Sequence, residues 1–366
     1  LNGRKSRSGW VLWAFAIAVA ANTLRPAETT AQSIILSPAE QIYADLAKLP
    51  PDERAAKIED GARKEGTVSI IQTVRNTIGI GQIDLFQKRY PFLKLDVTNS
   101  LGSPEGAEQL YSEEVAGRHL TDTINVTIFD MSELLRRNML ARFPTPETAR
   151  ILPKYRNIID PENRYTPANW SERGMVYNTN LVPPDKAPKK WMDLCGPFFR
   201  GNFSFDPVQS RLVSGFYALF GADTVNFIRC LGNNKPIVQR GIQERFTLMM
   251  AGDHMIDADA YPYQAIDEKR KNPNVPLAIS PAPVLAGFGA IGINRNTTHP
   301  YASALFTDFM LSDAEQNFLY RHLRGPVTMK HPYLPDNADL VVIPNLPSET
   351  LDPLVDEWKR DLDSRQ

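Results

Sequence analysis

Short apolar runs alternate with amphipathic segments along the first half of the chain. An apolar run bounded by turn residues predicts a buried strand, and an apolar period near 3.6 predicts a helix. The expected strands are residues 67–73, 93–98 and 124–129, and the expected helices are 80–90, 103–116 and 131–138. Strands that alternate with helices of about ten residues form right-handed βαβ units in a parallel sheet. The pattern therefore predicts an α/β fold.

The alternation stops in a proline-rich stretch, residues 143–167, and then resumes. Further strands are expected near Met175, at 202–205 and at 255–260, and helices at 210–220, 223–231 and 241–251. A late strand at 289–295 leads into two helices, the second of which begins at the capping box Ser312 to Glu315. Two α/β blocks separated by an extended segment predict two lobes.

The first residues have the layout of a secretory signal. Arg4, Lys5 and Arg7 precede an apolar run at 9–21, and small residues lead up to Ala31. The run is shorter than the roughly 20 residues that span a bilayer, so we expect a signal peptide of residues 1–31 and a periplasmic protein. A helical lead-in, 32–65, follows, with a capping box at Ser37 to Glu40 and a glycine stop after it.

Charge and cysteine content narrow the function classes. The chain has 41 basic and 42 acidic residues, a formal net charge of −1, which provides no electrostatic footprint for nucleic acid. The two cysteines, Cys195 and Cys230, either form a disulfide in an oxidising compartment or remain two separate thiols. The sequence alone leaves both alternatives open, because it does not give the distance between their Cα atoms.

Two short patterns suggest chemistry that their context does not support. Gly287 to Gly292 matches the dinucleotide string GxGxxG, but these glycines run into a strand instead of opening a helix, so we expect close backbone packing. The cluster Asp253, His254, Asp257 and Asp259 fits no zinc or calcium spacing, and we expect it to form a solvated turn beside a strand. No phosphate loop or nucleophile elbow is present in the sequence.

Polar residues gather where predicted strands end, which is where α/β sheets bind ligands. Arg75 and Asn76 follow the first strand, Asp130 follows the third, and Gln209, Ser210 and Arg211 open a helix. A helix N-terminus offers free N–H groups and a positive dipole to an anion. These positions are therefore candidate solute contacts.

Several segments, in this order and spacing, resemble the type 2 periplasmic solute-binding proteins of ABC importers, in the branch that includes the ferric-iron-binding proteins. The resemblance runs from about Glu65 to about Phe318. Its carriers are Lys64 to Gly66, Phe86 to Pro91, Asn125 to Asp130 with Leu134, Val176 to Pro184 with Ala187, Pro188 and Trp191, and Thr298 to Ala304 with Phe306, Asp308, Phe309, Leu311, Ser312 and Gln316.

The resemblance implies two lobes of mainly parallel sheet flanked by helices and joined by extended hinge strands. Lobe 1 is expected at 66–172 and 284–340, and lobe 2 at 173–283 and 341–366. A monomer of this kind closes on a small solute and delivers it to a membrane permease, with no catalysis and no cofactor. The alternative is a secreted enzyme on the same architecture.

The resemblance also implies where the solute is held. The expected contacts are Arg75, Asn76, Asp130, Tyr177, Gln209, Ser210, Arg211, Tyr261 and Tyr263. If the solute is Fe³⁺, Asp130, Tyr261 and Tyr263 are its expected ligands, with both phenols on one side of an extended segment around Pro262. Arg75 and Arg211 instead suit a carboxylate or phosphate, so the residues favour an anion, alone or as a partner to iron.

Overall fold

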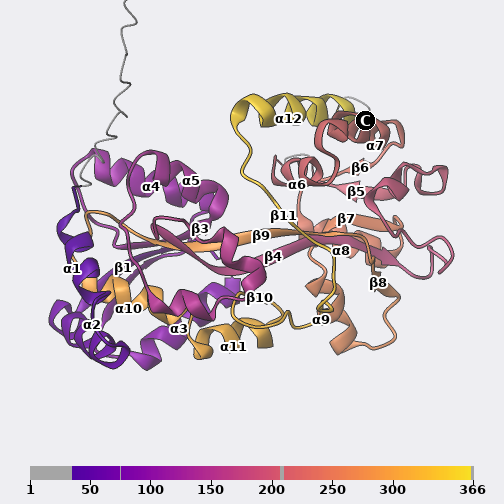
Figure 1. Cartoon of the computed structure of the whole chain (residues 1–366). Coiled ribbons are helices and arrows are strands. Elements are labelled where there is room, and N and C mark those ends of the chain that lie inside the picture. Colours follow the sequence, from indigo (N-terminus) through magenta and orange to yellow (C-terminus); the bar gives the residue numbers. More distant parts are fainter. Residues whose placement is uncertain (1–34, 75, 207–209, 364–366) are drawn as a thin grey trace, which may run out of the picture. The chain divides into compact units, whose positions relative to one another are not determined.

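The computed structural model describes residues 35–74, 76–206 and 210–363 (Figure 1). The predicted signal peptide, 1–31, lies outside these residues, as do Arg75 and Gln209. In the described ranges, none of the helices is long and apolar enough to cross a membrane.

Two helices lead into the first sheet, α1 (Pro38–Leu46) and α2 (Pro51–Glu65). The predicted capping box at the start of α1 is confirmed: Ser37 Oγ accepts from Glu40 N–H, and the Glu40 carboxylate accepts from Ser37 N–H. Gly66 ends α2 with φ at 70°, in the left-handed region that favours glycine. Local signals therefore set both ends of the lead-in.

The first lobe is built around β1 (Thr67–Gln72), β2 (Lys94–Thr98) and β3 (Thr123–Thr127), which pair in parallel. Its helices are α3 (Asn76–Arg89), α4 (Ser103–Val115), α5 (Ile128–Arg136), α10 (Pro300–Met310) and α11 (Asp313–Arg321). Buried Ile70, Phe86 and Phe306 belong to a core cluster that also includes Tyr43 and Leu46 of α1. We refer to this set of elements as the β1–β3 lobe.

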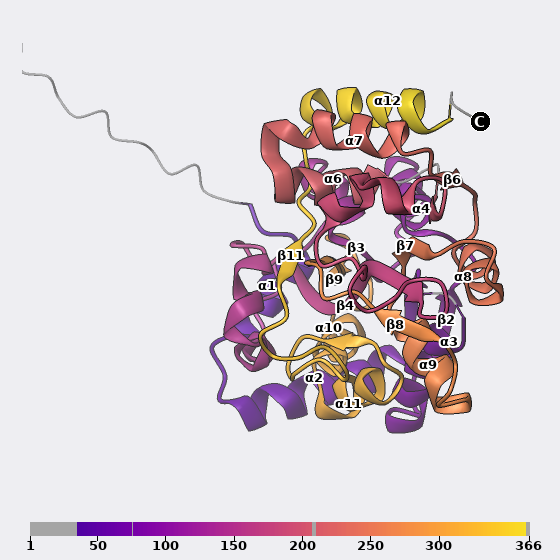
Figure 2. The same cartoon turned by 90° about the vertical axis from the view of Figure 1, so that its right-hand side faces the viewer.

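The second lobe is built around β5 (Phe203–Phe205), β6 (Ile237–Val238) and β7 (Ile256–Ala260), where β5 pairs in parallel with both others. Its helices are α6 (Ser210–Phe220), α7 (Thr224–Asn233), α8 (Ile242–Ala251), α9 (Tyr263–Lys271) and α12 (Ser348–Asp363). Figure 2 shows α12 running along α7, and Trp358 of α12 is buried against Phe205 and Phe216. We refer to this set as the β5–β7 lobe.

Two long antiparallel strands, β4 (Tyr165–Asn178) and β9 (Val284–Ile293), connect the lobes (Figure 1). The sheet order is β2-β1-β3-β9-β4-β7-β5-β6, with β9 beside β3 and β4 beside β7. The short strands β8 (Leu277–Ile279), β10 (Gly325–Pro326) and β11 (Leu340–Val342) pair with β4 or β9. This is the expected two-lobed fold with extended hinge strands.

The hinge strands begin earlier than the sequence pattern predicts. Residues 165–167 were expected to be irregular, and β9 was expected only from Gly289, but pairing between Arg173 and Leu285 extends both strands. The glycines 287, 289 and 292 all lie inside β9, although only the last two were expected in a strand, and they do not form a phosphate loop. A Cβ on Gly289 would meet Asn169 Oδ1 at 2.5 Å, so close packing against β4 explains this glycine.

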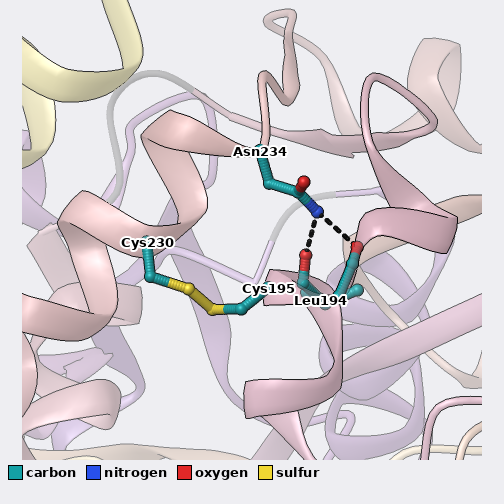
Figure 3. Close-up of a disulfide and its surroundings, with 5 residues drawn as sticks. Leu194, Cys195, Cys230 and Asn234 are labelled. Atoms are coloured by element: carbon teal, nitrogen blue, oxygen red, sulfur yellow. Dashed lines mark hydrogen bonds between the residues drawn. A yellow bond between two sulfur atoms is a disulfide. The ribbon is translucent and has the colours of Figure 1, made fainter.

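The connections contain short 3₁₀ helices and a disulfide. The 3₁₀ helices are η1 (Pro146–Arg150), η2 (Pro153–Ile158), η3 (Trp191–Cys195), η4 (Pro197–Phe199) and η5 (Gly221–Asp223). Cys195 at the end of η3 is bonded to Cys230 of α7, with their Cα atoms 5.7 Å apart (Figure 3). Beside this bond, the Asn234 amide donates to the carbonyls of Leu194 and Gly196. Of the two alternatives for these cysteines, the structure contains the disulfide.

Candidate functional site

A cavity of about 360 Å³ lies beside the hinge strands β4 and β9. Side chains from both lobes line it: Thr127 and Asn125 come from β3, and Arg211 and Tyr263 come from α6 and α9. This volume lies in the range of small-molecule sites, roughly 300–1,000 Å³. The position and size of the cavity make it the candidate solute site.

Two arginines and two tyrosines form a stacked column in the cavity wall. The guanidinium of Arg173 lies 4.0 Å from the centre of the Tyr261 ring, and that of Arg324 lies 3.7 Å from the centre of the Tyr263 ring. The two tyrosine rings stack with centroids 5.5 Å apart and an interplanar angle of 29°. Each phenol ring therefore faces a cation, an arrangement that holds both guanidinium groups at the cavity by cation–π attraction.

A buried ionic network holds Arg173 in place. Nη1 of Arg173 donates to the backbone oxygen of Asp259 at 3.1 Å and lies 3.3 Å from Oδ1 of its carboxylate. Arg245, which is fully buried, contacts the same carboxylate at 3.3 Å and those of Asp206 and Asp257 at 3.2 and 3.4 Å. Burial raises the pKa of Asp259, and the two arginines oppose that rise. The network positions Arg173 without using its remaining donors.

Asp130 lies behind the cavity wall in the first turn of α5. Thr127 caps this helix by accepting from Asp130 N–H, and the Asp130 carboxylate accepts from Thr127 Oγ1 at 2.6 Å and from Ser103 Oγ. Nη2 of Arg211 is 3.3 Å from the same carboxylate. This ion pair joins the β1–β3 lobe to the β5–β7 lobe across the cavity.

The cavity wall contains hydrogen-bond donors that lack acceptors. Among the residues that the structure describes, Nη1 of Arg324 and Nδ2 of Asn125 are buried without a hydrogen-bond partner. Asn125 is 1% exposed, and a buried N–H without an acceptor costs about 1–3 kcal/mol.

The structure brings together four of the residues that the sequence predicted for the site. Arg211, Tyr261 and Tyr263 line the cavity, and Asp130 contacts three of its lining residues, Ser103, Thr127 and Arg211. The segment around Pro262 is not the extended strand that we expected: Pro262 is helical, with φ −55° and ψ −26°, and Tyr263 starts α9. The two phenol rings nevertheless lie side by side.

The other predicted residues lie elsewhere or cannot be placed. Arg75 and Gln209 lie outside the described residues, and Asn76 is placed only as the first residue of α3. Ser210, the first residue of α6, is exposed and is not part of the cavity lining. Tyr177 packs against the core of the β5–β7 lobe, and burial raises the pKa of its phenol.

Sequence reasoning missed Arg173, Arg324 and Asn125. For Arg173 the sequence does contain a signal, because a charged residue within a mostly buried strand is unusual. This strand is one of the two hinge strands. Arg324 follows α11 in a loop, and no periodicity marks it as different from the exposed Arg321 three residues earlier. Asn125 lies in a segment that carried the family resemblance, but only the fold shows its unpartnered amide.

The expected iron ligands, Asp130, Tyr261 and Tyr263, stay a prediction, and each of them lies beside an arginine. Within the described ranges, no three His, Cys, Asp or Glu residues are grouped so that they could hold a metal ion, but the expected ligand set has only one carboxylate and two phenols. Burial raises the pKa of the Tyr263 phenol, which opposes the phenolate that Fe³⁺ requires, although Arg324 partly offsets this rise. The cationic groups that face Asp130, Tyr261 and Tyr263 are arginines of the protein itself.

The cluster at 253–259 is not the solvated turn that we expected, because His254, Asp257 and Asp259 are buried. Asp257 and Asp259 are buried and paired with Arg245, and His254 accepts or donates a 2.9 Å hydrogen bond with Ser204 Oγ. Burial lowers the pKa of His254 to about 4. These side chains stabilise the end of β7 that leads into Tyr261.

Comparisons with known proteins agree with this fold. No curated protein sequence matches the chain. Similar solved structures include iron-bound HitA from Pseudomonas aeruginosa (17% identity, 82% of this chain and 98% of that chain, TM-score 0.64). A second similar structure is the periplasmic binding protein AfuA from Actinobacillus pleuropneumoniae with fructose-6-phosphate (18% identity, 82% of this chain and 99% of that chain, TM-score 0.65). A third is the substrate-binding protein of an ABC transporter from Agrobacterium tumefaciens (14% identity, 81% of this chain and 94% of that chain, TM-score 0.67). Residues 131–340, more than half of the chain, match the family described as "Bacterial extracellular solute-binding protein". The chain is therefore a member of the bacterial extracellular solute-binding protein family.

Proposed function

We propose that the protein is the periplasmic receptor of an ABC importer and that its solute is a small anion. The family match supports the receptor role, and the similar ABC-transporter protein from Agrobacterium tumefaciens supports the importer. Delivery to the permease would follow closure of the lobes, which requires no chemical step. The receptor would work as a monomer, because a solute held between its two lobes needs no second chain.

One observation carries the choice of an anion: three arginines, from three different segments of the chain, line the cavity. Arg173, Arg211 and Arg324 all line it, and Arg324 keeps a buried N–H without an acceptor within the described part of the chain. Guanidinium groups bind carboxylate and phosphate oxygens in a fixed, often bidentate geometry. A trivalent cation beside three guanidinium groups would be repelled.

The test pairs two variants of the column. Arg324→Gln should weaken anion binding by about 1.5–3 kcal/mol, the usual worth of a hydrogen bond to a charged group. Tyr263→Phe keeps the ring that faces Arg324 and should cost less than about 1 kcal/mol. Titration calorimetry and thermal shift with phosphate, sulfate, small carboxylates and ferric citrate measure both effects. Arg321→Gln, on an exposed residue of α11, is the matched control and should bind like the wild type.

Two results would contradict this proposal. A coloured protein that loses its colour in Tyr263→Phe and keeps its affinity in Arg324→Gln would identify Fe³⁺ as the solute. A solute that is converted instead of being recovered unchanged would favour the secreted enzyme. A ligand present at about 100 times its Kd raises stability by roughly 2.7 kcal/mol, so a true solute gives a clear thermal shift.

A further inference from the structure

The cavity is larger than an inorganic anion needs. At about 30 Å³ per water, its volume of about 360 Å³ holds roughly a dozen waters. A phosphate or sulfate bound to the arginines would leave most of this space filled with water. The arginines, Asn125 and Asp130 therefore account for only part of the site.

The remaining wall is apolar and partly exposed. Val74 comes from the end of β1, Ile128 and Phe129 open α5, and Ile343 follows β11. Phe129 and Ile343 also pack against the core of the β5–β7 lobe, although Phe129 belongs to a helix of the β1–β3 lobe. Apolar side chains that face water in a cavity gain from a ligand that covers them, about 25 cal/mol for each Å² removed from water.

Three of the polar side chains in the wall are hydrogen-bonded within the protein, whereas Asn169, Ser171 and Asn345 also line the cavity. Thr127 and Ser103 donate to Asp130, and Thr73 Oγ1 donates to the backbone oxygen of Asn125 at 2.7 Å. The cavity thus combines a cationic column with an apolar wall.

Gly287 opens space between these two regions. It lines the cavity from β9, and a Cβ placed on it would meet only Ile343 Cδ1 at 3.8 Å and Ser171 O at 3.9 Å. These are ordinary contacts, so no close approach requires glycine here, in contrast to Gly289, where a Cβ would meet the Asn169 side chain. The missing side chain leaves room beside Ile343 that a ligand can fill.

We infer that the solute is an organic anion, with a carboxylate or phosphate held at the Arg173–Tyr261–Tyr263–Arg324 column and an apolar or aromatic body packed against Val74, Phe129 and Ile343. This inference rests on the proposed function and narrows its substrate class. It distinguishes the protein from a receptor for free phosphate, for Fe³⁺ or for a sugar phosphate.

Three probes with one shared head group test the inference: inorganic phosphate, phenyl phosphate and glucose 6-phosphate, with benzoate as a carboxylate counterpart. Titration calorimetry should show phenyl phosphate binding at least about tenfold tighter than inorganic phosphate, the ratio expected when some 60 Å² of apolar surface leaves water. Glucose 6-phosphate should bind more weakly than phenyl phosphate. Benzoate should compete with phenyl phosphate for the same site.

Two variants of cavity residues distinguish binding of the ligand's apolar body from binding of its phosphate group. Gly287→Val fills the space beside Ile343 and should weaken phenyl phosphate about tenfold while changing inorganic phosphate less than about twofold. Ile343→Ala removes apolar wall without adding bulk and should also weaken only phenyl phosphate, so a folding defect in one variant leaves the other informative. Arg324→Gln should weaken all phosphate probes.

The outcomes distinguish this inference from the proposed function. Inorganic phosphate that binds as tightly as phenyl phosphate, or glucose 6-phosphate that binds tightest and is unaffected by Gly287→Val, would overturn the organic apolar body but keep an anion receptor. No binding of any probe up to about 10 mM, the limit of weak specific binding, would overturn both. Loss of phenyl phosphate binding in Arg324→Gln but not in Arg321→Gln would support both.

Discussion

At the scale of single residues, Glu315 takes part in only half of the capping box that the sequence predicts, because tertiary contacts hold its side chain elsewhere. Ser312 caps α11 by accepting from Glu315 N–H, as the sequence predicted. The second half of the capping box is missing, because the Glu315 side chain is fully buried and accepts instead from Nε2 of Gln82 in α3. Its other oxygen has no hydrogen-bond partner among the described residues. Burial raises the pKa of this carboxyl to about 7.

This pKa makes the stability depend on pH. Because the folded pKa is above the ordinary value of 4.5, the protonated form contributes stability that is present below pH 4.5 and is lost as the pH rises through about 7. Glu315→Gln cannot ionise, so the variant should avoid a loss of roughly 3 kcal/mol between pH 4.5 and 8. Urea unfolding at pH 5 and pH 8 measures the difference. Glu108→Gln, on an exposed residue of α4, should keep the pH dependence of the wild type, and an identical slope in both variants would refute the role of Glu315.

At the scale of elements, the disulfide joins two pieces that the chain separates by 35 residues. Cys195 ends η3, and Cys230 lies in α7 (Figure 3). The Asn234 amide also links the two elements by donating to the carbonyls of the residues on either side of Cys195. Neither cysteine lines the cavity. The pair therefore supports the core of the β5–β7 lobe and not the solute directly.

Removal of the disulfide should lower stability without changing affinity. The double variant Cys195→Ala with Cys230→Ala should lose about 2–4 kcal/mol of unfolding free energy, the usual effect of opening a loop of this length. Its affinity for the best anion probe should stay within about twofold of the wild type. Denaturant unfolding with and without reductant checks this, since the wild type should respond to reductant and the double variant should not. An unchanged midpoint in the reduced wild type would contradict the prediction.

At the scale of the whole molecule, two contacts cross from one lobe to the other beside the hinge strands. Arg211 of α6 pairs with Asp130 of α5, and Tyr263 of α9 faces Arg324, which follows α11. Each is modest, about 0.2–1 kcal/mol for a partly exposed ion pair and about 0.5–2 for a cation–π contact.

The double variant Asp130→Asn with Tyr263→Leu should shift the solute-free protein toward more open forms. Losing about 1–2 kcal/mol from the closed state changes the open-to-closed ratio by roughly 5–30-fold. Small-angle X-ray scattering should then give a larger radius of gyration than for the wild type. Glu133→Gln removes an ion pair with Arg137 inside α5 and serves as the control, with no expected change. A radius equal to that of the wild type would mean that these two contacts do not hold the lobes together.

Much of the fold could be predicted because its signals are local. The helix 210–220 was predicted with the bounds that α6 has, and Ser37, Glu40 and Gly66 act as predicted. Neighbouring residues along the chain supply these hydrogen bonds and apolar periods, so no tertiary information is needed. The strand 124–129 was wrong at its end, because Thr127 caps α5 and draws Phe129 and Asp130 into that helix.

The sequence by itself determined the α/β alternation, the anion-favouring arginine at 211 and the tyrosines at 261 and 263. Only the tertiary structure decided what those tyrosines face, because Arg173 and Arg324 come from distant segments that pass through or beside the hinge. It also decided the disulfide and the buried state of Glu315. Periodicity follows from bonds between near neighbours, whereas charge balance in a cavity depends on contacts between residues more than sixty positions apart.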